Sequence, residues 1–396
     1  MKIAIVDTTI DHEPIGGAHT FLPGLLRGLI ASGHDVRLVV KDKVHPKIEP
    51  AIRATGVSIS ERPWPDDFSE KATPRFAEWV AKLAPDIFLI STSADIGWLV
   101  LPLLPPNIAT ISIGHNDIAA YYDPARHYAS FLTRAVGVSD EICRNYESVS
   151  RMSHDSVDWI PYGVETALSE PRADLDRPLQ LVYIGRVEEK QKRFQDLVKV
   201  ALRLAAEEVD FVFHIVGDGP SMPRAKQQLA SLIDDERVFV RGWVSADEVI
   251  EIERSSDILL MASAFEGFSV ALTEAMANGC CPVVTDIRSG NKQLVCDGEN
   301  GFVVPVKDID AFVDKIKFLA DHRDRLLEMR RKAWQTGREY SIERMVENYE
   351  RCFERAIKDV SEHPRTPDPS FPLMPSCRSK YPLWLRRIKA KLVDRK

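Results

Sequence analysis

The sequence predicts an α/β protein built from two doubly wound domains, each with a parallel sheet covered by helices on both faces. A chain of 396 residues is too long for one core and suits two domains of roughly 100–200 residues each. Short apolar runs alternate with amphipathic helical stretches, which is typical of βαβ units. This alternation stops once, near the middle of the chain, and then restarts.

The first domain is expected over residues 1–165, followed by a linker over residues 166–178. The linker interpretation depends on a polar stretch that contains Pro171 and Pro178. Within the first domain the apolar runs predict strands at Lys2–Val6, Val36–Val40, Asp86–Ser91, Ile108–Ile113 and Arg134–Val138, with helices at Ala18–Ala31 and Pro74–Leu83.

The second domain is expected over residues 179–340. Its predicted strands are Leu179–Ile184, Phe211–Val216, Val238–Val240, Ile258–Ala262 and Cys281–Thr285. Its predicted helices are Arg193–Ala206, Met222–Ile233, Ala246–Arg254, Val270–Asn278 and Ile309–Ala320. A further helix over residues 341–360 is expected to pack back toward the first domain, and residues 361–396 are expected to form a proline-rich segment and a basic amphipathic tail.

Bulk composition excludes several classes of protein. A formal net charge of −7 argues against nucleic acid as the main partner. Six scattered cysteines without a C-x-x-C pair suit a reduced, cytoplasmic protein and give no support to a zinc site. The first residues are interrupted too soon by Asp7 for a signal peptide, and no apolar run approaches the ~18 residues of a membrane span.

Two loops have the composition of phosphate-binding loops. Gly16 and Gly17 follow the first strand and precede a helix, where glycines let backbone N–H groups approach an anion; a plain flexible loop is the alternative. In I-G-R-V-E-E-K-Q-K-R-F, Arg186 and one of Lys190, Lys192 or Arg193 are placed to clamp a diphosphate. The alternative is a solvated run of charges that opens a surface helix.

The stretch E-G-F-S-V-A-L-T-E-A-M-A-N-G, residues 266–279, reads as a capped helix that begins at the ligand edge of the second sheet. Ser269 is expected to cap the helix. The backbone N–H groups at its start are expected to form an anion-binding site, at Gly267, Phe268, Ser269 and Val270. Glu266 and Glu274 suit sugar hydroxyls because a carboxylate only accepts hydrogen bonds and its two oxygens match a vicinal diol. Two ordinary surface glutamates are the alternative.

These residues resemble the retaining, nucleotide-sugar-dependent glycosyltransferases of family four, which have the GT-B fold. The resemblance covers nearly the whole chain. It rests on the E-x7-E motif of Glu266 and Glu274, and on further motifs in the family's order: Gly16-Gly17, S-G-H-D-V at 32–36, His115 in I-G-H-N-D, V-G-V-S-D-E-I at 136–142, I-P-Y-G-V-E at 160–165, G-R-V with Lys192, and V-G-D-G-P at 216–220.

The resemblance implies a role for each matched residue. Arg186 and Lys192 would hold the donor diphosphate, together with amides near Gly17 and residues 267–270. Glu274 would bind the ribose, and Glu266 the transferred sugar. His115 would lie beside that sugar, so Glu266 and His115 are the expected catalytic residues. Gly242 and Val244 would flank the base through their backbone.

The implied activity is transfer of a hexose from a UDP- or GDP-sugar to a glycan or lipid-linked acceptor, with retention of anomeric configuration, in cell-surface polysaccharide or glycolipid synthesis. No convincing carboxylate pair for double displacement is present, and the resemblance implies no metal or other cofactor. Two D-x-D strings, at 174–176 and 308–310, fall outside the ligand edge. Gln293 departs from the family, where many relatives have a glutamate, which puts contacts with the donor sugar in doubt.

Two other functions are weighed against this one. A nucleotide-sugar epimerase shares the architecture but lacks the ordered motifs. A non-catalytic nucleotide-sugar-binding homologue would be expected to lose Glu266, Arg186 or Lys192, and all three remain. In the tail, residues 376–396, basic side chains beside Leu383 and Trp384 suggest peripheral contact with the inner, anionic face of a membrane; a disordered or packed tail is the alternative.

Overall fold

The computed structural model describes residues 1–8, 10, 18–41, 43–63, 69–92, 96–167, 169–171, 177–288, 290–372 and 374. Gly16, Gly17 and the basic tail of residues 376–396 lie outside the described residues. The side chains of residues 18–20 and 69–71 are likewise not described. Among the described helices, none is both long and apolar enough to cross a membrane.

The first domain is built on a parallel sheet with strand order β3-β2-β1-β4-β5-β6-β7. Its strands are β1 (Lys2–Asp7), β2 (Asp35–Val40), β3 (Ser58–Glu61), β4 (Ile87–Ile90), β5 (Ala109–Gly114), β6 (Arg134–Gly137) and β7 (Val157–Trp159). Its helices are α1 (Ala18–Ala31), α2 (Glu49–Ala54), α3 (Ser69–Leu83), α4 (Ile96–Leu99), α5 (Ala119–His127) and α6 (Asp140–Ser148).

The second domain repeats this plan with strand order β10-β9-β8-β11-β12-β13, again parallel. Its strands are β8 (Leu179–Ile184), β9 (Phe211–Val216), β10 (Val238–Gly242), β11 (Ile258–Met261), β12 (Cys281–Thr285) and β13 (Phe302–Val304). Its helices are α7 (Phe194–Ala206), α8 (Met222–Gln228), α9 (Ala230–Asp234), α10 (Ala246–Ser255), α11 (Val270–Ala277), α12 (Asn291–Leu294), α13 (Ile309–Asp321) and α14 (Arg323–Arg338).

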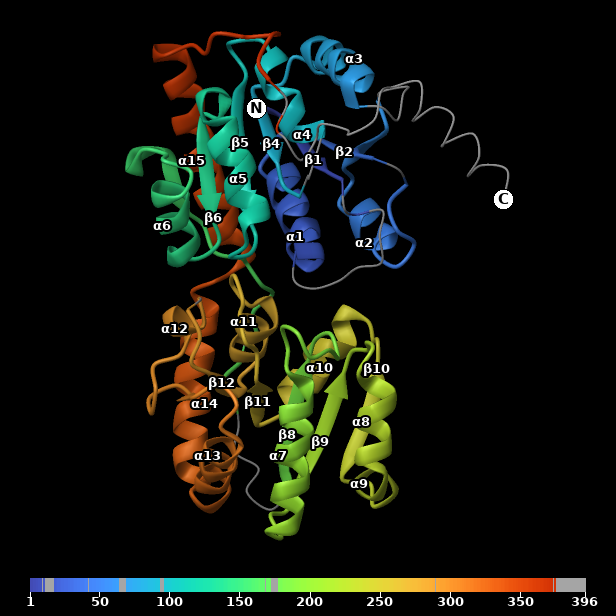
Figure 1. The fold of residues 1–396 in the computed structure, drawn as a ribbon. Coiled ribbons are helices and arrows are strands. Elements are labelled where there is room, and N and C mark those ends of the chain that lie inside the picture. Colours follow the sequence, from blue (N-terminus) through green and yellow to red (C-terminus); the bar gives the residue numbers. More distant parts are fainter. Residues whose placement is uncertain are drawn as a thin grey trace, which may run out of the picture.

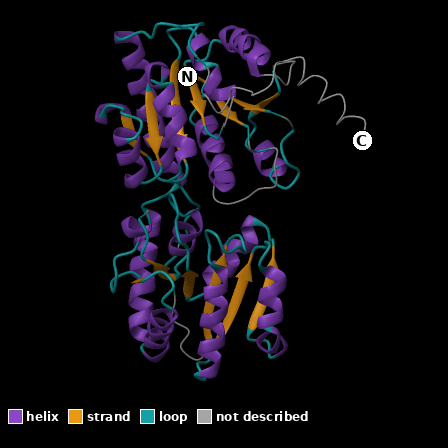
Figure 2. Cartoon of the chain, viewed as in Figure 1, coloured by secondary structure: helices purple, strands orange, loops and turns teal. Residues whose placement is uncertain are grey.

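The two domains lie one above the other, and the carboxyl ends of both sets of strands point toward the junction between them (Figure 1; Figure 2). Ligands of open α/β sheets bind at the carboxyl ends of the strands. The fold therefore brings the ligand edges of the two sheets face to face.

The last helix, α15 (Ile342–Glu362), returns from the second domain to the first (Figure 1). It packs closely on α1, where a Cβ at Gly28 would lie 2.2 Å from a methyl carbon of Val346. In the middle of β7 the buried Asp158 accepts from Arg134 of β6 at 2.7 Å and from Arg355 of α15. This ion cluster joins α15 to the first sheet.

After α15 the proline-rich segment crosses the first domain, where its course is fixed by specific contacts. Arg365 donates to the carbonyl oxygens of Phe131 and Pro105, each at 3.1 Å. The Phe371 ring packs against the rings of Phe131 and Tyr128 at centroid distances of 4.8 and 5.8 Å. An irregular backbone was expected here, and these contacts hold it in place.

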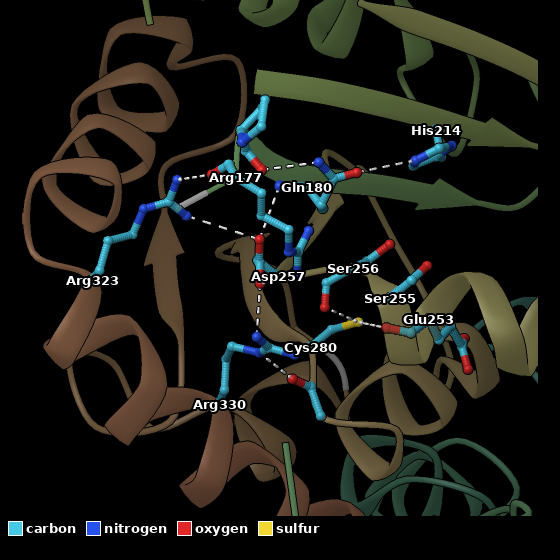
Figure 3. A network of polar contacts seen from close by, with 12 residues as sticks. Arg177, Gln180, His214, Glu253, Ser255, Ser256, Asp257, Cys280, Arg323 and Arg330 are labelled. Carbon is cyan, nitrogen blue, oxygen red and sulfur yellow. Dashed lines mark hydrogen bonds and ion pairs between the residues drawn. The ribbon is translucent and has the colours of Figure 1, made fainter. Parts of the chain in front are cut away.

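A polar network ties the second domain together at the edge opposite the junction (Figure 3). Asp257, directly before β11, accepts from Arg177 at 3.0 Å, from the backbone N–H of Gln180 at 2.9 Å and from Arg330 of α14 at 2.7 Å. Arg330 also donates to the carbonyl oxygen of Gly279 at 2.8 Å. The network joins the linker, β8, β11 and α14 around one buried carboxylate.

All ten predicted strands are present, with bounds that shift by two residues at most. The sequence missed β3, β7 and β13, which are short strands at sheet edges. It also missed α14. The helix predicted over Met222–Ile233 was wrong as one helix, because α8 ends at Gln228 and α9 begins at Ala230. Leu229 is fully buried at this break, so an apolar residue there preserves the helical pattern across it.

Candidate functional site

The stretch at residues 266–279 forms the predicted capped helix at the junction. The Ser269 hydroxyl accepts from the backbone N–H of Leu272 at 3.4 Å, which caps α11. The helix ends before Gly279, whose φ of +91° is in the left-handed region. The amino end of α11 thus directs its first-turn N–H groups, and the positive end of the helix dipole, away from its own sheet and toward the first domain (Figure 1).

Glu266 is buried in the loop that leads into this helix and is held by three side chains. Its Oε1 atom lies 2.6 Å from Lys192 Nζ and accepts from the Ser263 hydroxyl at 2.7 Å. Its Oε2 atom accepts from Gln191 Nε2 at 3.0 Å. The carboxylate therefore has a fixed position and a cation at hydrogen-bond distance.

The loop that carries Lys192 is organised by Glu188. The Glu188 carboxylate accepts from the backbone N–H groups of Lys190, Gln191 and Lys192 at 2.7, 2.9 and 2.9 Å. Burial by itself raises the pKa of Glu188, but these three donors outweigh it, and the pKa lies below its ordinary value. This folded loop positions Lys192 against Glu266.

Of the three basic residues considered beside Arg186, the structure brings only Lys192 to Glu266. Arg193 instead donates through Nε to Asp196 at 2.8 Å, and Lys190 is exposed. Arg186 donates to Gln191 Oε1 at 3.2 Å, while its buried Nε has no hydrogen-bond partner within the described part of the chain. Gln191 thus links Arg186 to Glu266, and Arg186 keeps one donor for another acceptor.

Two glycines bring the V-G-D-G-P loop against the loop that carries Arg186. A Cβ at Gly217 would lie 2.0 Å from the carbonyl oxygen of Gly185, and one at Gly219 would lie 2.4 Å from that of Val187. Gly217 also donates to the carbonyl oxygen of Gly242 at 2.7 Å. The predicted base-flanking segment, Gly242 to Val244, therefore lies beside the phosphate-binding candidates.

Glu274 lies on α11, partly exposed and close to the segment that leaves the first domain. Burial, followed by the nearby Glu165 carboxylate, raises the pKa of Glu274 to about 7. Behind it Glu253 is fully buried, and Asn278 Nδ2 donates both to Glu253 Oε2 at 2.7 Å and to the Glu274 carbonyl oxygen at 3.1 Å. Burial, then the Glu274 charge, raises the pKa of Glu253 well above its ordinary value.

His115 forms the first domain's side of the site. It follows β5 directly and is buried, with Nδ1 2.6 Å from the Tyr162 hydroxyl oxygen. Its carbonyl oxygen would lie 2.4 Å from a Cβ placed on Gly267, so the backbones of the two domains touch here. The structure therefore brings the amino end of α11, Glu266 and Lys192 to the residue that the sequence singled out in the first domain.

The sequence missed four residues that shape this site: Glu188, Gln191, Tyr162 and Ser263. Gln191 and Glu188 share a loop with the predicted basic residues, and Tyr162 lies inside the quoted I-P-Y-G-V-E motif. Their proximity in sequence was a signal, but only the loop geometry shows which carboxylate or ring each one contacts. Gly16 and Gly17 stay predictions, because they lie outside the described residues.

Gln293, the departure from the family pattern, lies on the short helix α12. Its Oε1 atom is buried without a hydrogen-bond partner within the described segments. The neighbouring Gly290 donates to the Gly267 carbonyl oxygen at 3.1 Å, and a Cβ on Gly290 would lie 2.6 Å from the Phe268 ring. The α12 segment therefore packs against the start of α11, near Glu266.

Comparison with known proteins gives family matches to both halves of the chain. The family described as "Glycosyl transferases group 1" matches residues 166–340, and "Glycosyltransferase Family 4" matches residues 15–168. A lipopolysaccharide 1,6-galactosyltransferase of Salmonella typhimurium is 29% identical over 252 residues, which cover 60% of this chain and 66% of the relative.

A second relative, a UDP-Gal:alpha-D-GlcNAc-diphosphoundecaprenol alpha-1,3-galactosyltransferase of Escherichia coli, is 32% identical over 115 residues, 29% of each chain. The matched regions thus span less than two thirds of the length of these curated relatives.

Two solved structures share the fold. The pneumococcal O-GlcNAc transferase GtfA, in complex with UDP and GlcNAc, superposes with a TM-score of 0.75 at 14% identity, covering 90% of this chain and 99% of that one. The lipopolysaccharide outer core galactosyltransferase WaaB in its apo form gives a TM-score of 0.69 at 19% identity, with the same coverage. Both are GT-B proteins, so the two facing sheets of this chain form a GT-B fold.

Proposed function

Because the chain belongs to the group 1 glycosyltransferases, a family of transferase enzymes, we propose that it moves a hexose from a UDP- or GDP-sugar to a hydroxyl of a glycan or lipid-linked acceptor. The relatives named for lipopolysaccharide and diphosphoundecaprenol substrates support a role in surface glycan synthesis. The observation that carries the proposal is the Lys192–Glu266 pair at the amino end of α11, beside His115 of the first domain.

We assign binding of the diphosphate of the nucleotide sugar to three groups of hydrogen-bond donors. Lys192 supplies a point charge, and the first-turn amides from Gly267 to Val270 supply N–H groups. Arg186 supplies its guanidinium fork, including Nε, which has no partner among the described residues. As the bond to the sugar breaks, negative charge grows on the diphosphate. Each preorganised donor aimed at that charge is worth ~3 kcal/mol of transition-state stabilisation.

The two glutamates of α11 are assigned to two different rings of the donor. Glu274 accepts from the ribose hydroxyls, because this half-buried residue lies on α11 near Glu165. Glu266 accepts from hydroxyls of the transferred sugar, because it precedes the helix at the contact with the first domain. His115 and the loops of the first domain then border the acceptor.

Retention of configuration is part of the proposal, and the way Glu266 is held supports a route to it other than double displacement. Its oxygens accept from Lys192, Ser263 and Gln191, which lowers their nucleophilicity and suits binding of hydroxyls rather than attack on the anomeric carbon. We therefore propose a front-face reaction in which the leaving diphosphate takes the proton of the acceptor hydroxyl. The product's anomeric configuration, measured by NMR, tests this: inversion would contradict it.

Metal independence is part of the proposal, because Arg186, Lys192 and the α11 dipole supply the positive charge that a cation would bring. Activity measured after treatment with a chelator, and again after Mg²⁺ or Mn²⁺ is added, is expected to stay constant. A loss restored by one of these cations would overturn this part alone.

A panel of UDP- and GDP-sugars, offered with lipid-linked glycan acceptors, tests the activity. One donor is expected to release its nucleoside diphosphate only when acceptor is present, together with an elongated product. Binding of a donor without turnover across the acceptor panel would favour the non-catalytic homologue. Conversion of the donor to an epimer without transfer would favour the epimerase.

A further inference from the structure

Four buried polar residues form a continuous chain behind the contact between the two domains. Asp7 ends β1, Ser91 follows β4 and His115 follows β5, and these three strands are neighbours in the first sheet. Ser91 Oγ lies 3.2 Å from Asp7 Oδ2 and 3.4 Å from His115 Nε2, and His115 Nδ1 lies 2.6 Å from the Tyr162 hydroxyl oxygen. Each of the four is at most 7% exposed.

The direction of each hydrogen bond follows from counting protons. A carboxylate only accepts, whereas a serine hydroxyl has one proton to donate and lone pairs to accept with. If Ser91 donates its proton to Asp7, its oxygen can only accept from His115 Nε2. In neutral imidazole one nitrogen carries the proton and the other accepts, so Nδ1 must then accept from the Tyr162 hydroxyl.

Two further observations fit this order. Burial, followed by neighbouring Tyr121, Tyr349 and Glu266, raises the pKa of Tyr162 above its ordinary value, so that its hydroxyl keeps its proton. The Tyr162 and Phe21 rings pack on the imidazole at 5.8 and 5.4 Å.

We propose that Asp7 and Ser91 fix neutral His115 in the Nε2–H tautomer, with Tyr162 donating to Nδ1, and that all three act as positioning residues for the His115 backbone against Gly267. Both imidazole nitrogens are then bound by the protein. His115 therefore does not take the proton of the acceptor hydroxyl. It forms part of the first domain's surface at the junction, with its carbonyl oxygen facing the start of α11. This last step rests on the proposed function, whereas the tautomer does not.

The tautomer can be measured without any substrate. In protein labelled with ¹⁵N-histidine, two-bond ¹H–¹⁵N correlation spectra at pH 8 distinguish a protonated from an unprotonated ring nitrogen. The His115 signals are identified by their loss in His115→Gln. We expect a protonated Nε2 and an unprotonated Nδ1. A protonated Nδ1 in the unsubstituted protein would overturn the proposal, whatever the activity.

Substitutions test which residues cause His115 to prefer the Nε2–H tautomer. Ser91→Ala removes the acceptor for Nε2–H, so the Nδ1–H form is expected to gain population. Asp7→Asn, which can donate to Ser91, is expected to free the Ser91 proton and shift the tautomer in the same direction. Ser112→Ala is the matched control, because Ser112 is another buried serine, on β5, whose hydroxyl makes no hydrogen bond to a described residue. An unchanged His115 spectrum in both Ser91→Ala and Asp7→Asn would contradict the proposal.

Kinetics then test the positioning role. Tyr162→Phe keeps the ring and removes the hydroxyl that donates to Nδ1. We expect kcat to fall about tenfold. The KM for the nucleotide sugar should change little, because the residues assigned to bind it lie mainly in the other domain. A higher KM for the sugar donor with an unchanged kcat would contradict the positioning role. Sugar transfer could be absent from the unsubstituted protein and from every variant, while His115 still has the expected tautomer. The proposed function would then fail, and the tautomer assignment would stand.

Discussion

Lys192 Nζ lies 2.6 Å from Glu266 Oε1, and the residue after Glu266 touches the backbone of His115 in the other domain. The cation assigned to the donor diphosphate and the carboxylate assigned to the donor sugar are therefore one ion pair. A bound donor must share Lys192 between Glu266 and phosphate. This couples the grip on the leaving group to the position of the sugar.

Replacing Lys192 with Ala is expected to slow transfer ~10²–10³-fold, because it removes a donor to the leaving diphosphate and also unpairs buried Glu266. The measurement is kcat with saturating acceptor. Lys226→Ala, which removes an exposed lysine from α8, is the control and is expected to leave kcat unchanged. If Lys190→Ala lost as much activity as Lys192→Ala, the assignment to Lys192 would be wrong.

Replacing Gly267 with Ala is expected to reduce activity by forcing the domains apart. The new Cβ would lie 2.4 Å from the His115 carbonyl oxygen and 3.0 Å from Asn116 Cα, and both are backbone atoms. Overpacking of this kind costs about 1–3 kcal/mol. Gly24→Ala is the comparison, because its Cβ would meet only the Ile342 side chain, at 3.2 Å. Full activity in Gly267→Ala would show that this contact is absent in the working enzyme.

Donor affinity is expected to rise with pH through about 7. The ribose hydroxyls need the ionised form of Glu274, whose raised pKa of about 7 leaves about one molecule in eleven ionised at pH 6 and about ten in eleven at pH 8. The Kd for a nucleotide sugar should thus be about tenfold larger at pH 6. A nucleotide sugar is the right probe, because it has no terminal phosphate that titrates in this range.

Glu274→Gln is the control for this pH dependence, because it keeps the volume of the side chain and removes its titration. The variant should bind more weakly than the unsubstituted protein at pH 8 and show a nearly flat profile. An equally steep profile in Glu274→Gln would assign the dependence to another group.

The central strands of the fold could be read from sequence because strands buried on both faces are continuous apolar runs bounded by turn residues. Edge strands could not. In β3, Ser58 and Glu61 are exposed and no residue is fully buried, so the segment resembles a loop. α14 was missed because its amphipathic pattern is dominated by charged residues, although buried Arg330 anchors it to Asp257.

The site could be predicted as a set of residue types but not as a set of contacts. The order of the motifs singled out Glu266, Lys192 and His115, and the structure brings Lys192 onto Glu266 and His115 to the adjacent Gly267. The left-handed backbone at Arg193, with φ of +49°, turns its side chain to Asp196 and leaves Lys192 for Glu266. Charge and spacing alone do not distinguish these two neighbouring cations, and only the family motif pointed to Lys192.

The most direct test of the central claim separates the two glutamates of α11 by calorimetry with UDP or GDP, whichever binds the unsubstituted protein, at pH 8. Loss of charge-assisted hydrogen bonds to ribose should weaken binding about 10- to 100-fold in Glu274→Ala. Glu266→Ala should bind the same nucleotide within about threefold of the unsubstituted protein and instead lose kcat about 100-fold. Nucleotide binding that is unchanged in Glu274→Ala, or equally weakened in both variants, would contradict the account.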